Sequence, residues 1–453
     1  MKLWCELAWL GGERPQSGVV IDVKGGRITA IEIGVALQPP ESERLEGLVL
    51  PGLANAHSHA FQRALRGRTH TGAPTATGPG SFWTWREQMY ALVESITPDA
   101  MYALTRATFA EMALAGITLV GEFHYLHHDD GGARYADPNE MGLSVVRAAR
   151  EVGLRLTLLD TCYPHGGIDA APYGPQLRFC DADADDWRRR ADLLVDGLGR
   201  SEESVLIGAA IHSVRAVDPA AAQTVAAWAS HRVAPLHAHV SEQPAENEAC
   251  IEAYGVSPTE LLERAGALSR NFTAVHATHV SANDVELLGT AGACCCLCPT
   301  TERDLADGVG PARALCDAGV RLALGTDSNA MIEPLEEARA VELDERLVTG
   351  VRGKHEPRAL LQAATEGGYQ SLGWPEGGSL REGGYADLVA VRLGGVRLAG
   401  TAPDHALGAV VFAGAAADVS DVMVGGNFVV RDGAHVALDV PSELQAAVAG
   451  LGR

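Results

Sequence analysis

Lysine is almost absent from this chain of 453 residues: only Lys2, Lys24 and Lys354 occur among its 36 basic residues. The 58 acidic residues outnumber the basic ones and give a formal net charge of −22. Nucleic-acid binding requires a basic surface, so we expect no nucleic-acid partner. An acidic surface also repels anionic ligands, so an anionic substrate would need arginines placed close to it.

Long apolar runs are missing as well. No run approaches the roughly 20 residues that a membrane-spanning helix needs, so we expect no membrane association. The first residues, MKLWCELAWLGGERPQ, make a poor signal peptide because Glu6 interrupts a short apolar stretch. Nine cysteines include Cys294, Cys295, Cys296 and Cys298, which we interpret as buried strand residues in a reducing cytoplasm. Neighbours in a strand face opposite ways, so this run does not predict a metal site.

The two ends of the chain share one texture. Short Val- and Ile-rich runs with Gly-Gly or Asp-Gly turns occur at both ends, as in GVVIDVKGGRITAIEIG, GAVVFAG and DVMVGGNFVVRDGAHV. Such runs predict hairpins. We therefore expect one small β-sandwich domain built from residues 1–50 and 376–453.

Between these ends, short apolar runs alternate with stretches of helical composition such as DAMYALTRATFAEMALA. Eight strand–helix units in about 325 residues predict an α/β fold, a (β/α)8 TIM barrel, over residues 51–375. Catalytic groups of such a barrel lie at the carboxyl ends of its strands. The predicted strands are 53–57, 116–123, 154–163, 205–212, 233–239, 272–279, 293–298 and 320–328.

Metal-binding residue types follow four of these predicted strands. The first ends in His57 and His59, which share a face because strand side chains alternate. The fifth offers His237, His239 and Glu242, the sixth His276 and then His279, and the eighth Asp327. Two histidines from one strand, a third histidine and an aspartate would suit zinc, with water completing the coordination.

The stretches LPGLANAHSHA and GSLREGGYADLVAV resemble the entry and exit motifs of the amidohydrolase superfamily, so the resemblance spans essentially the whole chain. Many members hold two metals through a carboxylated lysine on strand 4, and this chain has no lysine between Lys24 and Lys354. The resemblance therefore implies the mononuclear deaminase branch, with one Zn²⁺ per chain. His239 and Glu242 fit the His-x-x-Glu pattern of that branch, and we expect His237 to support the site without binding the ion.

Finer stretches, among them SFWTWREQMY, HSVRAV, HVSEQPAE, VHATHV and CPTTERDLADG, resemble the formimidoylglutamate deiminases of bacterial histidine degradation. That family hydrolyses N-formimino-L-glutamate to N-formyl-L-glutamate and ammonia. The resemblance implies zinc on His57, His59, His239 and Asp327, and catalytic roles for Glu242, His276 and Asp327. It also implies substrate contacts from Gln62, Arg86, Tyr125, His212 and Arg215.

Several alternatives stay open on the sequence. The chain could be another mononuclear deaminase, acting on guanine, a thioether nucleoside or a triazine, or a noncatalytic barrel scaffold. Arg215 could pair with a nearby acid such as Asp218 and not with a carboxylate of the substrate. Residues 60–95 are interpreted as a lid or a subunit contact, and a homodimer is expected. We expect a solvated loop without metal at His124, His127 and His128.

Overall fold

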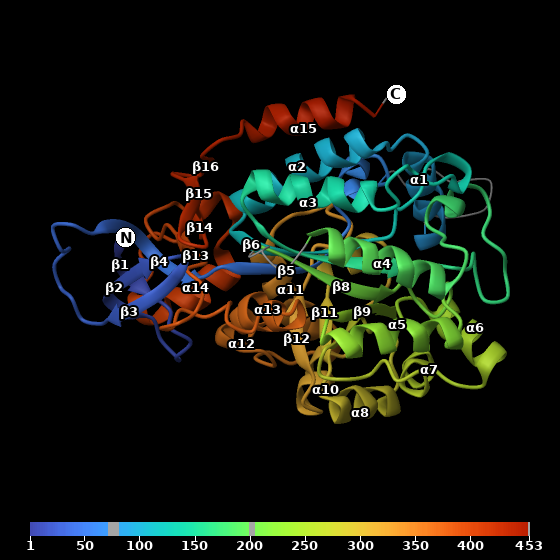
Figure 1. The fold of residues 1–453 in the computed structure, drawn as a ribbon. Helices are drawn as coiled ribbons and strands as arrows, with labels where there is room; N and C mark the ends of the chain where they lie inside the picture. Colours follow the sequence, from blue (N-terminus) through green and yellow to red (C-terminus); the bar gives the residue numbers. More distant parts are fainter. Residues whose placement is uncertain (71–80, 199–203, 452–453) are drawn as a thin grey trace.

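The computed structural model describes residues 1–70, 81–198 and 204–451 and contains two eight-stranded sheets (Figure 1). One is a parallel barrel whose strand order follows the chain, which confirms the predicted fold class. A bridge between Ser58 and Asp327 joins its first and last strands. The barrel strands are β5 (Leu53–Ser58), β6 (Ile117–His124), β7 (Arg155–Cys162), β8 (Val205–Ile211), β9 (Leu236–Val240), β10 (Phe272–His276), β11 (Cys294–Leu297) and β12 (Arg321–Leu324).

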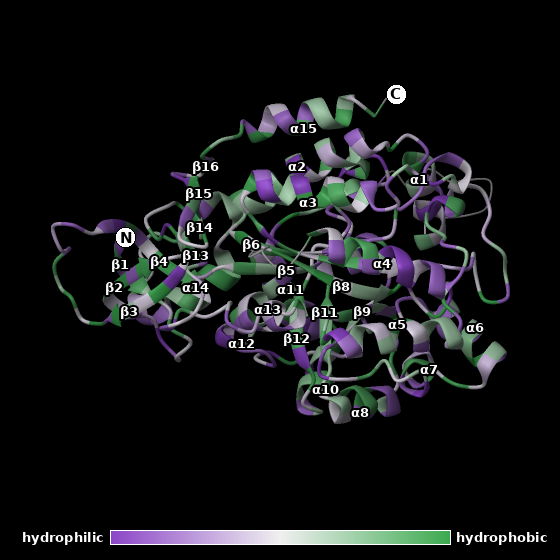
Figure 2. Cartoon of the chain, viewed as in Figure 1, coloured by the Kyte–Doolittle hydropathy of each residue, from purple (hydrophilic) through white to green (hydrophobic). Residues whose placement is uncertain are grey.

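Helices cover the outside of the barrel, and their starts follow the capping rules. Thr97, Asp218 and Ser257 each accept a backbone N–H of the helix that follows, and each precedes a proline at the first helical position. Figure 2 shows alternating polar and apolar residues along outer helices such as α3 and α4, as expected for one buried face. The helices from the first barrel strand onward are α1 (Phe82–Val93), α2 (Pro98–Leu114), α3 (Glu140–Val152), α4 (Ala184–Leu198), α5 (Pro219–Arg232), α6 (Pro244–Tyr254), α7 (Pro258–Arg264), α8 (Ala282–Ala291), α9 (Pro299–Asp304), α10 (Ala312–Asp317), α11 (Pro334–Thr349) and α12 (Pro357–Gln362).

The amino-terminal end of the barrel is closed by the chain that follows α12. A π-helical turn, η4 (Ala363–Gly367), leads into α13 (Gly368–Ser371), which contacts β5 and β12. The Tyr369 hydroxyl lies 2.7 Å from Thr118 Oγ1 at the start of β6. Thr157 near the start of β7 donates to the Leu372 carbonyl over 2.8 Å. The site must therefore open at the opposite, carboxyl end of the strands.

The second sheet joins both chain ends, as predicted. Its strand order is β16-β15-β14-β13-β4-β1-β2-β3. Alternate residues of β13 serve two cores: Leu388 and Ala390 pack in the small core of this sheet, whereas Val389 and Val391 belong to the core shared with the barrel. The strands are β1 (Lys2–Ala8), β2 (Gln16–Lys24), β3 (Arg27–Glu32), β4 (Glu43–Pro51), β13 (Leu388–Val391), β14 (Val419–Val424), β15 (Asn427–Arg431) and β16 (Ala434–His435).

One stretch with a β-like texture is helical. GAVVFAG lies in α14 (Ala406–Ala413), whose residues Ala406, Leu407, Val410 and Val411 are buried at helical spacing against α11 and α12. The last helix, α15 (Val440–Ala449), lies along α2 (Figure 1). Both helices fall in the region assigned to the terminal domain, and the predicted domain boundaries stay a prediction.

Two further expectations concern the segment 60–95 and association with a membrane. Residues 71–80, the Pro- and Gly-rich part of the segment interpreted as a lid or subunit contact, lie outside the described residues. Around them, a 3₁₀ turn, η1 (Ala60–Leu65), and α1 flank the carboxyl end of the barrel. Among the described residues no helix is long and apolar enough to cross a membrane. The homodimer stays a prediction.

Candidate active site

Four predicted ligands converge at the carboxyl ends of β5, β9 and β12. Nε2 of His57 and Nε2 of His59 each lie 3.3 Å from Asp327 Oδ1, and His239 Nε2 lies 3.2 Å from His57 Nε2. All four side chains are buried. His57, His59 and Asp327 form one group that could hold a metal ion, and His57, His239 and His276 form another.

These separations fit a tetrahedral ion. Nitrogen and oxygen ligands lie about 2.0–2.1 Å from Zn²⁺, so neighbouring ligand atoms of a tetrahedron are roughly 3.3 Å apart. The observed separations of 3.2–3.3 Å match that edge. Three imidazoles and one carboxylate thus form a donor set that fits one metal ion.

Hydrogen bonds on the outer side of the rings fix two of the histidines. Nδ1–H of His59 donates to the Phe123 carbonyl over 2.9 Å, and Nδ1–H of His239 donates to the His212 carbonyl over 2.8 Å. Because a carbonyl only accepts, Nε2 of each ring is left with its lone pair facing the site. Burial lowers the pKa of His59 to about 3 and holds the pKa of His239 well below its usual range, so both rings are neutral, as ligands must be.

The backbone around Asp327 is held in an unusual conformation. Asp327 has φ +46°, in the left-handed region that non-glycine residues rarely adopt. Its N–H donates to the His57 carbonyl, and its own carbonyl accepts from the His59 N–H, both over 2.9 Å. Asn329 Nδ2 donates to the His59 carbonyl over 3.1 Å. These bonds tie the end of β12 to the end of β5 and so maintain the strain.

His276 lies among three acidic side chains. Its Nδ1 is 3.3 Å from Glu302 Oε1, and its Nε2 is 3.7 Å from Glu242 Oε1 and 3.8 Å from Asp327 Oδ2. Burial lowers the pKa of His276, but these carboxylates outweigh it and raise that pKa to about 10. The histidine is thus oriented by Glu302 and faces Glu242 and the ligand group.

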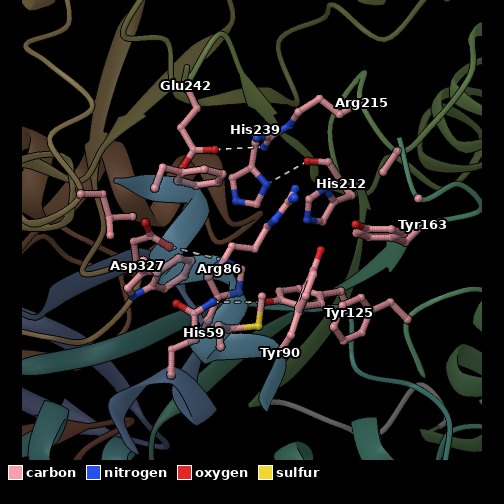
Figure 3. Close-up of a pocket in the computed structure, with 18 residues that line it drawn as sticks. His59, Arg86, Tyr90, Tyr125, Tyr163, His212, Arg215, His239, Glu242 and Asp327 are labelled. Carbon is pink, nitrogen blue, oxygen red and sulfur yellow. Dashed lines mark hydrogen bonds and ion pairs between the residues drawn. The ribbon is translucent and has the colours of Figure 1, made fainter. Parts of the chain in front are cut away.

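A pocket of about 670 Å³ opens above the ligand group (Figure 3). All five residues expected to contact substrate line it: Gln62, Arg86, Tyr125, His212 and Arg215. His59, His239, Glu242 and Asp327 line it as well, whereas His57 and His276 lie beneath its lining. Gln62 Nε2 donates to the Tyr125 hydroxyl over 3.0 Å, which fixes the two relative to each other.

The two arginines of the pocket have different partners. Arg215 NH2 lies 3.0 Å from Glu242 Oε2, and its Nε lies 3.5 Å from Glu246 Oε2. Asp218, the alternative partner, caps α5 and pairs with His165 instead. Arg86 stacks over Trp83 and Tyr90, and among the described residues no carboxylate pairs with it. Arg86 is therefore the pocket cation whose charge is left for a ligand.

Two sets of histidines lie elsewhere. His237 sits one layer deeper in the barrel, with Nε2 3.0 Å from the Ser371 carbonyl, and His279 Nε2 is 2.7 Å from the Asp307 carbonyl. The expectation of a solvated loop at His124, His127 and His128 was wrong, because all three are buried. The backbone N–H groups of His127 and His128 both donate to the Arg178 carbonyl, which draws this loop into the protein.

Some site residues were not anticipated from the sequence. Glu302 and Glu246 pair with His276 and Arg215, and Tyr90 and Tyr163 line the pocket. Glu302 falls within CPTTERDLADG and Tyr90 within SFWTWREQMY, two of the stretches that carried the family resemblance. Glu246 falls within HVSEQPAE, a third such stretch, whereas for Tyr163 the only signal was its position at the end of a barrel strand.

Residues 48–429 match the amidohydrolase family, and the match covers most of the chain. This chain belongs to the amidohydrolase family. This amidohydrolase is 40% identical to a formimidoylglutamate deiminase of Pseudomonas aeruginosa over 405 aligned residues. The alignment covers 87% of each chain. It is also 30% identical over 430 residues to an 8-oxoguanine deaminase of the same organism, covering 92% of this chain and 91% of the other.

Solved structures agree on the fold of this amidohydrolase. The crystal structure of an amidohydrolase from Brucella melitensis superposes with a TM-score of 0.90 at 35% identity and covers 99% of both chains. An adenosine deaminase from Xanthomonas campestris, solved with bound zinc, superposes with a TM-score of 0.84 at 23% identity, covering 99% of this chain and 97% of the other. Family membership and the deiminase relative make this protein a hydrolase of C–N bonds, and its donor group fits the metal on which amidohydrolases depend.

Proposed function

We propose that this amidohydrolase hydrolyses N-formimino-L-glutamate to N-formyl-L-glutamate and ammonia, with one Zn²⁺ per chain held by His57, His59, His239 and Asp327. The 40% identity to a formimidoylglutamate deiminase supports this substrate, and we propose that the reaction serves bacterial histidine degradation, as the family resemblance implies. One observation carries the proposal: Arg86 lines the same pocket as the ligand group, and no carboxylate among the described residues pairs with it. A dianionic substrate of an acidic protein needs such a cation.

When bound, Zn²⁺ would lower the pKa of a coordinated water to about 7 and polarise the formimino group. Asp327 presents Oδ2 on the side of His276 and can take a proton from the attacking water. His276 lies within reach of the same position and can stabilise the negative charge that develops there. Each of these roles requires only atoms that already face the ligand group.

Glu242 can carry the proton to the leaving nitrogen. Its carboxylate lies between His276 and Arg215, so one oxygen faces the reacting centre while the other is held by the guanidinium. The formimino carbon bears two nitrogens, and the one that receives the proton departs. With Arg86 and Arg215 holding the glutamate carboxylates, the terminal imino nitrogen faces Glu242, and ammonia leaves.

A nucleobase deaminase is the second candidate. The aromatic side chains of Phe82, Trp85, Tyr90, Tyr125, Tyr163 and Phe179 line the pocket and could enclose a flat heterocycle. The 30% identity to an 8-oxoguanine deaminase points the same way. Against it, a neutral heterocycle gives Arg86 no charge to bind.

The test measures ammonia release from N-formimino-L-glutamate, guanine, 8-oxoguanine and a thioether nucleoside by enzyme with measured metal content. We expect turnover of the formimino compound, N-formyl-L-glutamate and ammonia by NMR, and close to one zinc per chain. Formamide and free glutamate would contradict the assignment of the scissile bond. Preferred turnover of a nucleobase would replace the proposal with the second candidate, and two required metals would rule out the mononuclear site.

The two arginines provide a matched pair of variants. Arg86→Met should raise KM about 10-fold or more with little change in kcat, because it removes a charge-assisted contact to substrate alone. Arg215→Met should lower kcat as well, because it also releases Glu242 and Glu246. Unchanged kinetics in Arg86→Met would contradict the carboxylate contact, provided that zinc content is unchanged.

A further inference from the structure

A buried glutamine lies directly behind the pocket wall, in the segment that follows β7. Gln176 belongs to the 3₁₀ turn η3 (Gly174–Arg178) and has no exposed surface. Its Oε1 accepts the Tyr173 N–H over 3.2 Å, and its Nε2 donates to the Gly166 carbonyl over 3.0 Å. A backbone N–H only donates and a carbonyl only accepts, so the orientation of this amide is determined.

The same amide nitrogen reaches two hydroxyls of the pocket. Gln176 Nε2 lies 3.1 Å from the Tyr90 hydroxyl oxygen and 3.5 Å from that of Tyr163. Gly166 permits this approach, since a Cβ there would lie 2.7 Å from Gln176 Oε1 and 2.5 Å from the Ala171 carbonyl oxygen. One of the two amide hydrogens goes to the Gly166 carbonyl, and the other is shared between the two tyrosine oxygens. Both oxygens therefore act as acceptors, and their own hydrogens remain to be placed.

The hydrogens of the two hydroxyls can be counted. Even if one tyrosine donated to the other, only one of the two hydroxyl hydrogens would be used. At least one hydroxyl hydrogen is left over, and no acceptor for it occurs within the part of the chain that the structure describes. Burial raises the pKa of Tyr163 well above its usual range, so this phenol keeps its hydrogen at neutral pH.

The remaining hydrogen faces the pocket. Tyr90 and Tyr163 both line it, and Figure 3 shows their hydroxyls turned toward its interior, across from Asp327 and His59. Arg86 stacks over the Tyr90 ring with 5.5 Å between the guanidinium carbon and the ring centroid. A hydroxyl donor beside a guanidinium that has no carboxylate partner among the described residues is suited to a carboxylate oxygen and gives no advantage to an apolar group.

We infer that Tyr90 and Tyr163 donate one hydrogen bond to a carboxylate of the substrate, and that Gln176 is the positioning residue that turns their hydroxyls into donors. The inference deepens the proposed function and rests on it for the identity of the carboxylate. Gln176 acts only through the two hydroxyls and does not touch the substrate. Together with Arg86, the pair would distinguish carboxylate-bearing formimino compounds from uncharged ones.

The experiment compares N-formimino-L-glutamate with N-formiminobutylamine, which lacks both carboxylates. The double variant Tyr90→Phe/Tyr163→Phe keeps both rings and removes both hydroxyls. It should raise KM for N-formimino-L-glutamate about 10-fold or more while kcat and zinc content stay near those of the wild type. KM for N-formiminobutylamine should not change. The ratio of kcat/KM for the dianion to kcat/KM for N-formiminobutylamine should therefore fall about 10-fold or more.

Gln176→Met is then tested in both backgrounds. It should raise KM in the wild type but have no further effect in the double phenylalanine variant, because its role passes through the hydroxyls. Tyr102→Phe, which removes a hydroxyl bonded to Glu151 on the outer helices, is the matched control and should change nothing. If Gln176→Met proves unstable, the tyrosine variants alone still decide on the hydroxyl donor.

Two outcomes would overturn the inference. An unchanged preference in the double phenylalanine variant would exclude the hydroxyl donor. An equal effect of Gln176→Met in both backgrounds would assign the glutamine a merely structural role. Failure of the wild type to release ammonia from N-formimino-L-glutamate would instead overturn the proposed function, and it is seen before any variant is made.

Discussion

At the carboxyl ends of the barrel strands, several buried polar atoms of the site lack partners among the described residues, whereas both oxygens of the Asp387 carboxylate at the opposite end accept hydrogen bonds. His57 Nδ1, Gln62 Oε1 and His276 Nε2 are buried at the site end and lack hydrogen-bond partners among the described residues. At the closed end, the Asp387 carboxylate accepts from Arg155 over 2.6 Å, from Tyr369 over 2.8 Å and from the Gly425 N–H over 2.7 Å.

The backbone at the site end is also strained. Ser241, His276, Ala277, Asp327 and Asn329 adopt positive φ angles at or just beyond the carboxyl ends of β9, β10 and β12. Non-glycine residues in this region carry a cost that persists only where surrounding contacts enforce it, and such residues cluster at functional sites. The site end therefore gives up stability for the arrangement of its donor group, while the closed end supplies stability.

The largest expected effect comes from a change at the site end that should not alter stability. Glu242→Gln removes the proposed proton carrier and should lower kcat by about 10²–10⁴-fold. Zinc content and the unfolding midpoint should remain those of the wild type, because Arg215 keeps Glu246 as a partner. Kinetics, metal analysis and thermal unfolding check this. A metal-free variant would instead make Glu242 a ligand.

The second prediction concerns the closed end. Asp387→Asn removes a buried carboxylate that accepts hydrogen bonds from Arg155, Tyr369 and the Gly425 N–H, and it should cost about 3–5 kcal/mol of unfolding free energy. The kcat of the folded fraction should not change. Denaturant unfolding measures the free energy of unfolding, and turnover at a single saturating substrate concentration measures kcat. Asp404→Asn, which breaks an exposed pair with Arg14, is the control and should cost about 0–1 kcal/mol. A selective loss of kcat in Asp387→Asn would show that the closed end also affects catalysis.

The third prediction, with the smallest expected effect, concerns a well-paired cluster around Asp181. This cluster lies at the carboxyl end of the barrel strands but outside the pocket. Asp181 contacts Arg190 over 2.8 Å and His128 over 3.3 Å, with His127 nearby, and Arg190 also holds Asp160. Burial raises the pKa of Asp181, but Arg190 and His128 outweigh it and hold that pKa below its ordinary value.

A lowered pKa in the folded state stabilises the protein above the unfolded pKa, and that stability is lost as the pH falls. The stability difference between wild type and Asp181→Asn should therefore be constant near pH 7 and shrink below about pH 4. Denaturant unfolding at a series of pH values measures it, and kcat at pH 7 should be equal in both proteins. A constant difference down to pH 2 would show that the Asp181 charge contributes nothing.

Much of the site could be predicted from the sequence, because in a barrel the order of the strands along the chain determines where their carboxyl ends lie. His57 and His59 end one strand, His239 ends another, and Asp327 follows the last, so a closed barrel brings them to one edge. The absence of lysine between Lys24 and Lys354 likewise excludes a carboxylated lysine on the fourth barrel strand as a bridge between two metals. The pattern GAVVFAG failed because a short apolar run fits a buried strand and a buried helix equally well.

The residue pattern alone was enough to predict the barrel, the terminal sheet, the family and the group of donor residues that meet at the barrel mouth. Only the tertiary structure decided which neighbour each of these residues has: Glu302 beside His276, Glu246 beside Arg215, Gln176 behind Tyr90, and a buried place for His127. The physical reason is that periodicity fixes the strand on which a residue lies and the end at which it emerges. Lateral contacts arise from the way loops of unrelated length fold across the barrel mouth, and no one-dimensional pattern encodes them.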